Sequence, residues 1–89
     1  MAKNVYVISY QGSKSAEIRE VIKSMGAWFG HFENQHLVST TWTIQQVIAA
    51  LDAVVAQKQD RLLIMRVDVL ERTGWLTPQG WDWLNKQLP

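Results

Sequence analysis

The chain has 89 residues, of which 47% are hydrophobic and 19% charged, so it is a folded protein with room for one small core. Its net charge is +1 and its nine Lys and Arg residues are spread along the chain, which is not the charge pattern of a non-specific nucleic-acid binder. Because cysteine is absent, disulfides and thiolate chemistry are excluded. No signal-peptide pattern opens the chain and no apolar run reaches membrane-spanning length, so we expect a cytoplasmic protein without membrane contact.

The first predicted strand, residues 4–10, is apolar on both sides, which is typical of a central strand covered on both faces. Alternation puts Val5, Val7 and Ser9 on one side and Tyr6, Ile8 and Tyr10 on the other. A helix is predicted over 15–25 because apolar residues recur at helical spacing, and Gly26 is expected to supply a left-handed stop.

Two further strands, 27–32 and 35–41, are predicted on either side of a tight turn at Glu33-Asn34, since Asn tolerates positive φ. Thr43 and Gln46 match a capping box, which predicts a helix with an apolar stripe reaching Val55. A polar connection over 58–60 leads to a fourth strand over 61–69.

Thr77-Pro78 is typical of a helix N-cap followed by a first-turn proline, so a short terminal helix is expected to carry Trp81 and Trp83. The order strand, helix, strand, strand, helix, strand predicts an α+β ferredoxin-like βαββαβ sandwich. Right-handed crossovers give an antiparallel sheet of order 4-1-3-2 with both helices on one face. We expect one domain, 1–89, with a C-terminal extension at 70–89.

The predicted sheet has a second apolar face that those two helices do not cover. Val5, Val7, one of Leu37 and Val38, and part of 62–65 lie on it. A second subunit is the simplest cover, and the terminal helix is the alternative. We therefore expect a homodimer.

Four short segments carry a family resemblance: Val7-Ile8-Ser9-Tyr10, Ile22-Lys23-Ser24-Met25-Gly26-Ala27-Trp28, Leu37-Val38 and Gly80-Trp81-Asp82-Trp83-Leu84. In these segments the chain resembles the SinR-family small ferredoxin-like proteins of bacteria and phage. That family is akin to the CRISPR-associated adaptation endonucleases and virulence-associated protein D.

The resemblance implies a homodimer that pairs through the open sheet face. In the adaptation endonucleases an Asp just after the first strand binds a metal ion between subunits, but this chain has Gln11 at that place. A neutral amide is a weaker ligand for a hard cation than a carboxylate, which argues against inherited nuclease chemistry.

Other constellations suggest little chemistry. His31 and His36 are predicted to face each other across the hairpin, but zinc takes three or four ligands, so no metal site or cofactor is predicted. Residues 11–15 contain Gly, Ser and Lys without the spacing of a phosphate loop. Their backbone N–H groups and Lys14 are predicted to form at most a weak anion site. Ser13 or Ser15 is predicted to act as the N-cap of the helix.

The candidate interface residues are Val5, Val7, Ser9, Gln11, Arg66, Asp68, Trp81 and Trp83. Arg66 and Asp68 share one side of the fourth strand, where they either protect an edge or make a polar contact. Trp81 and Trp83 are two residues apart and cannot share a helix face, so we expect one to pack inward and the other to meet a partner.

Three functions stay open on the sequence. The leading hypothesis is a non-catalytic dimeric module that works by binding, as an accessory or regulatory protein. The second is a metal-dependent nuclease that uses Ser9, Gln11 and Asp68 at the dimer seam. The third is a nucleic-acid binder, whose affinity would fall steeply with salt.

Overall fold

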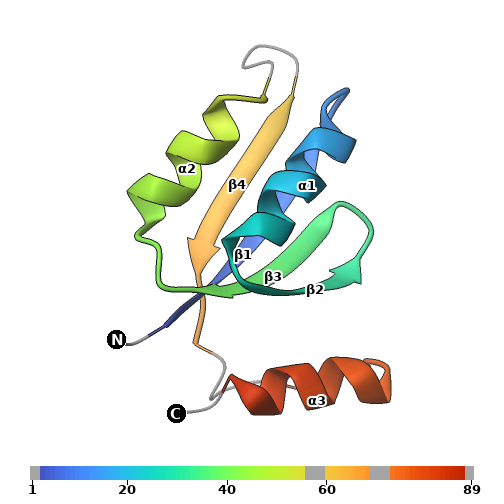
Figure 1. Ribbon diagram of the computed structural model, residues 1–89. Coiled ribbons are helices and arrows are strands. Elements are labelled where there is room, and N and C mark those ends of the chain that lie inside the picture. The colour runs from blue at the N-terminus through green and yellow to red at the C-terminus, as the bar shows by residue number, and fades with distance from the viewer. Residues whose placement is uncertain (1–2, 56–59, 69–72, 88–89) are drawn as a thin grey trace.

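The computed structural model describes residues 3–55, 60–68 and 73–87. Its elements, in chain order, are β1 (Asn4–Gln11), α1 (Ser15–Met25), β2 (Ala27–Phe32), β3 (Gln35–Thr40), α2 (Ile44–Asp52), β4 (Arg61–Arg66) and α3 (Pro78–Lys86) (Figure 1). Within these residues the protein is α+β, with one open, antiparallel sheet of four strands and three helices. The predicted connection at 58–59 lies outside the described residues.

The strands are ordered β2-β3-β1-β4, and all three pairings are antiparallel. Read from the β4 edge, this is the predicted order 4-1-3-2. The two strands with apolar residues on both sides, β1 and β3, are the central ones as expected. The predicted turn is also present: Asn34 has φ 59° and Phe32 pairs with Gln35 on either side of it.

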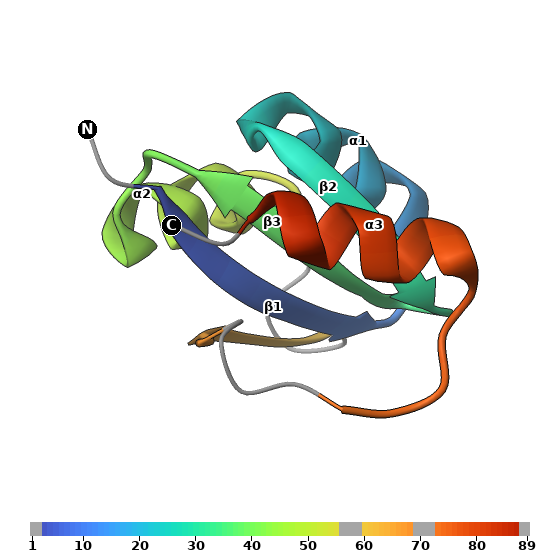
Figure 2. The ribbon, with the colours of Figure 1, turned by 90° about the horizontal axis from the view of Figure 1, so that it is seen from below.

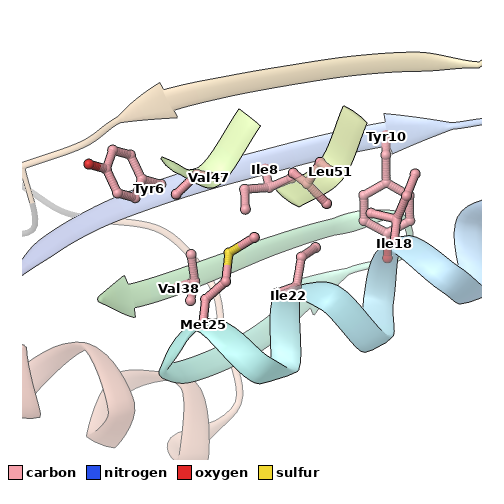
Figure 3. Close-up of a cluster of buried hydrophobic side chains, with 9 residues drawn as sticks. All are labelled: Tyr6, Ile8, Tyr10, Ile18, Ile22, Met25, Val38, Val47 and Leu51. Carbon is pink, nitrogen blue, oxygen red and sulfur yellow. The ribbon is translucent and has the colours of Figure 1, made fainter. Parts of the chain in front are cut away.

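The main core lies between the sheet and the helix pair α1 and α2, a face called here the helix face (Figure 1). Side chains from both helices and both central strands meet in it: Tyr6, Ile8, Tyr10, Ile18, Ile22, Met25, Val38, Val47 and Leu51 (Figure 3). Val38, not Leu37, is therefore the β3 residue that faces the helices. The capping box of α2 is present, because Thr43 Oγ1 accepts from Gln46 N at 3.3 Å and Thr43 N donates to Gln46 Oε1 at 2.8 Å.

The opposite side of the sheet, called here the far face, is partly covered by α3. Val5 and Leu84 are buried against each other, and the apolar side chains that pack on them come from β3, from α3 and from the segments just after β4 and just before α3. The rings of Phe29 on β2 and Trp83 on α3 stack with centroids 6.2 Å apart. Figure 2 shows α3 running beside β2 and β3. The sequence suggested either a second subunit or the terminal helix as the cover of this face. Within the single chain, the terminal helix covers part of it.

Gly26 ends α1 for a reason that differs from the predicted left-handed stop. A Cβ on this residue would collide with the carbonyl oxygen of Ser39 in β3. Glycine is needed because the chain turns from α1 into β2 directly against β3. Thr40 Oγ1 closes the same junction by donating to the carbonyl of Met25 at 2.8 Å.

The start of α1 is held by a residue far along the chain. The buried carboxylate of Asp60 accepts hydrogen bonds from Ser13 N at 2.9 Å and from Lys14 N at 3.2 Å. It satisfies N–H groups at the helix N-terminus, where α1 has no side-chain cap of its own. Gly12, with φ 141°, leaves the room that this carboxylate occupies.

Replacing this cap is expected to cost stability. Asp60→Ala leaves two N–H groups at the start of α1 without their acceptor and should lower the free energy of unfolding by about 1–3 kcal/mol. Urea titration followed by circular dichroism measures the change. Asp52→Ala, at an exposed carboxylate, is the matched control and should change it by less than about 0.5 kcal/mol. Equal stability of the two variants would contradict the role assigned to Asp60.

Candidate functional site

The largest exposed apolar side chains of β4 lie on the far face, beyond the part that α3 covers. Leu63 is 56% exposed and Met65 is 49% exposed. They stand opposite Ser9 and Val7 of β1, so they continue the far-face row that Val5 and Leu37 belong to. An edge strand in water ordinarily carries charge or proline at such positions. These two side chains therefore mark a surface that is unusually apolar for an edge.

A groove adjoins the same strand on its other side, between β4 and α2. It has a volume of about 310 Å³ and is lined by Ile44, Gln45, Ile48, Leu62, Leu63 and Ile64. Ile44 is itself exposed, at 37%. Together, Leu63, Met65 and this groove form what we call the β4 surface. The groove is lined by apolar side chains and the neutral amide of Gln45, so the β4 surface is suited to apolar contact.

The predicted interface residues of β1 are spread from a buried position to an exposed one. Val5 is only 7% exposed because Leu84 covers it, and Val7 is half-buried. Ser9 Oγ accepts a hydrogen bond from Gln35 Nε2 at 2.7 Å. Of these residues, Val7 and Ser9 border the β4 surface, whereas Val5 is already used inside the chain.

Gln11 lies at the exposed end of β1, at the rim of an open hollow of about 500 Å³. The hollow is lined by Ser9, Tyr10, Gln11, Glu33, Asn34, Gln35, Arg61, Leu62 and Leu63. One carboxylate and one guanidinium, Glu33 and Arg61, are its charged groups. A two-ligand or three-ligand carboxylate site for a hard cation is not assembled by this set of residues.

Arg66 and Asp68 lie at the end of β4 and just beyond it. Arg66 ends β4 on the helix-face side, opposite Tyr6, and is exposed. Asp68 follows the strand and is exposed as well, with interactions of its own. Their positions fit protection of the strand end by charge.

Trp81 and Trp83 are both half-buried against the cluster of Val5 and Leu84, so the expectation that only one faces inward is wrong. Leu84 is the side chain of the helix that is buried against Val5, and both indoles pack on that pair. The most exposed indole is instead Trp75, at 98%. Its position, in the segment before α3, gave no periodic signal in the sequence.

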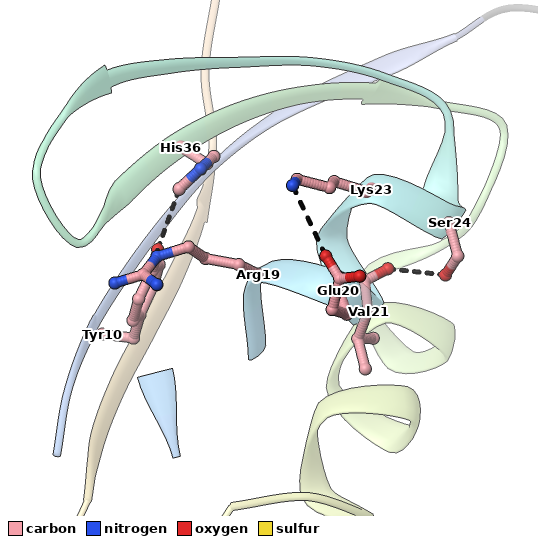
Figure 4. A network of polar contacts seen from close by, with 7 residues as sticks. All are labelled: Tyr10, Arg19, Glu20, Val21, Lys23, Ser24 and His36. Carbon is pink, nitrogen blue, oxygen red and sulfur yellow. Dashed lines mark hydrogen bonds and ion pairs between the residues drawn. The ribbon is translucent and has the colours of Figure 1, made fainter. Parts of the chain in front are cut away.

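Among the described residues no group of three or more His, Cys, Asp or Glu is close enough to hold a metal ion. His36 points into the helix face, and its Nδ1 lies 3.1 Å from the Tyr10 hydroxyl (Figure 4). Arg19 Nε donates to that hydroxyl at 3.1 Å, so the hydroxyl accepts from Arg19 and its own O–H can donate a hydrogen bond to Nδ1. The side chain of His31 lies outside the described part. The pairing of β2 with β3 also shifts between Phe29 and Phe32.

The weak anion site expected at the start of α1 is occupied by a carboxylate of the same chain, that of Asp60. Asp60 accepts from the backbone N–H groups of Ser13 and Lys14 that an anion would use. Ser15 Oγ donates to the carbonyl of Gly12 at 3.0 Å, so this serine does not serve as the N-cap. The carboxylate both fills the space and repels an incoming anion.

Comparison with known proteins gives no relative: no family model, no curated protein and no solved structure matches this chain. Among the described residues no helix is long and apolar enough to cross a membrane.

The cover that α3 provides on the far face can be tested by removing its central side chain. Leu84→Ala should lower the free energy of unfolding by about 2–4 kcal/mol, because Val5 loses the group that buries it. It should also raise the binding of a hydrophobic dye to the folded protein. Asp82→Ala, at an exposed position of the same helix, is the control and should change neither quantity. An unchanged stability for Leu84→Ala would show that α3 does not hold the far face.

Proposed function

We propose that the protein is a non-catalytic ferredoxin-like module that acts by binding another protein chain, and that it works as a homodimer. The observation that carries the proposal is the β4 surface: Leu63 and Met65 are about half exposed on a sheet face that α3 covers elsewhere. Apolar side chains gathered beside an open groove are the usual mark of a protein-protein contact.

The ferredoxin-like assignment rests on the element order βαββαβ and on the placement of α1 and α2 against the helix face. The proposal retains the relation to SinR-family proteins of bacteria and phage. That relation rests on the sequence segments that carry the resemblance.

A binding role is also favoured by where the polar groups lie. The Tyr10 hydroxyl bonds to both Arg19 and His36, and Asp60 bonds to the start of α1. These groups serve the fold, and Gln11 stands where the adaptation endonucleases have an acid. At β4, by contrast, Leu63 and Met65 are exposed apolar side chains.

Polar substitution on the β4 surface should weaken self-association. The double variant Leu63→Thr, Met65→Thr keeps β-propensity but removes two apolar side chains, and we expect its dimer dissociation constant to rise by about tenfold or more. Sedimentation equilibrium measures this constant. Trp28→Thr removes an apolar side chain that is 40% exposed at the opposite edge of the sheet, so it is the matched control and should leave the constant unchanged.

A wild-type protein that stays monomeric at hundreds of micromolar would contradict the dimer. Equal weakening by the double variant and by Trp28→Thr would contradict the assignment of the contact to β4.

Absence of nuclease activity is a second expected result. RNA and DNA incubated with the protein, with and without Mg²⁺ or Mn²⁺, should stay intact, because no carboxylate set for a hard cation is assembled at the end of β1. The readout is cleavage on a denaturing gel. Metal-dependent cleavage that Asp68→Ala abolishes would overturn the non-catalytic assignment in favour of a nuclease.

A further inference from the structure

We propose that two copies of this chain join their sheets edge to edge, with β4 of one copy antiparallel to β4 of the other and Ile64 on the two-fold axis. The inference rests on the proposed function and names its partner: the chain that the β4 surface binds is a second copy. The result is one continuous sheet of eight strands with the two α2 helices on the same side.

The two edges of the sheet differ in a way that selects β4. At the β2 edge the pairing is irregular between Phe29 and Phe32, and Gly30 lies within the irregular stretch. Bulges of this kind prevent a strand from accepting a new neighbour. At the β4 edge the register with β1 runs without a shift from Arg61 to Arg66, and the strand contains neither proline nor glycine. The β4 edge is therefore the one able to take another strand.

The backbone of β4 dictates which residues can pair outward. Val67 N donates to Val5 O at 2.9 Å, and Val67 continues the register in which Arg66 faces Tyr6. In an antiparallel pair, alternate residues direct their N–H and C=O to the same neighbour. The odd-numbered residues of β4 therefore bond toward β1, whereas Leu62, Ile64 and Arg66 direct theirs to the open edge.

This alternation restricts how the strand can pair with its own copy. Even-numbered residues must stand opposite even-numbered ones, so Arg61 cannot stand opposite Arg66 of the second copy. The register centred on Ile64 pairs the whole extended segment 61–67 with itself. In it, Arg61 stands opposite Val67 and Arg66 opposite Leu62, so no two like charges face each other across the axis.

The same register brings the exposed apolar groups together. Leu63 of one copy stands opposite Met65 of the other, and the symmetry repeats the contact on the other side of the axis. Four side chains that are about half exposed in the single chain then form one far-face strip. On the helix face, Ile64 of the second copy lies beside the groove that Ile44 and Ile48 line. The surface is thus complementary to itself in both hydrogen bonding and side-chain character.

Single cysteines test this register cleanly because the chain has none of its own. Directly opposite residues of a pair not joined by hydrogen bonds have Cα atoms about 4.5 Å apart, within reach of a disulfide, whereas diagonal neighbours are about 7–8 Å apart. Leu63→Cys mixed with Met65→Cys should therefore form a cross-linked dimer under mild oxidation, and each variant alone should give only background. Trp75→Cys, at the most exposed apolar position, measures the background from random collisions.

Each other outcome overturns the inference. Strong cross-linking of Leu63→Cys alone, or of Met65→Cys alone, means a register centred on a different residue. Cross-linking of the mixture at the level of Trp75→Cys means that β4 does not pair with β4. If sedimentation still shows a wild-type dimer in that last case, the proposed homodimer stands and only its geometry fails. A wild-type protein that is monomeric would contradict both the homodimer and the proposed pairing of β4 with β4.

Discussion

A sheet whose central strands are apolar on both faces needs two covers, and this constraint shapes the whole molecule. The helices α1 and α2 bury one face, where Tyr6, Ile8 and Val38 meet them. The terminal helix α3 covers part of the other face, over β1, β3 and β2, through Leu84, Trp81 and Trp83. Nine residues of α3 do not reach across the whole sheet. Among the described residues, Leu63 and Met65 of β4 remain exposed on that face, and the proposed contact follows from this exposure.

Most of the fold could be predicted from local patterns. The bounds of α1, the turn at Asn34, the capping box at Thr43 and the N-cap at Thr77 are set by neighbours within a few residues, and the structure has all of them. The strand order followed from handedness rules applied to that list of elements. These features could be predicted because each depends on residues that are close together in the sequence.

The features that the sequence did not predict have causes far apart in the chain. The bond from Asp60 to the start of α1 spans 47 residues, and nothing near Asp60 signals it. The inward packing of both Trp81 and Trp83 depends on how α3 lies against the sheet, which helical spacing alone does not fix. The sequence placed part of 62–65 on an uncovered sheet face, and the register of β4 with β1 shows that Leu63 and Met65 are the side chains exposed there.

The most direct test of the central claim is amide hydrogen exchange along β4 at low and high protein concentration. In the single chain, the N–H groups of Leu62, Ile64 and Arg66 face the open edge and should exchange fast, whereas those of Leu63 and Met65 are bonded to β1 and should exchange slowly. Pairing of two copies predicts that exchange at Leu62, Ile64 and Arg66 slows as the concentration rises. Fast exchange at these three amides at every concentration, beside protected Leu63 and Met65, would contradict it.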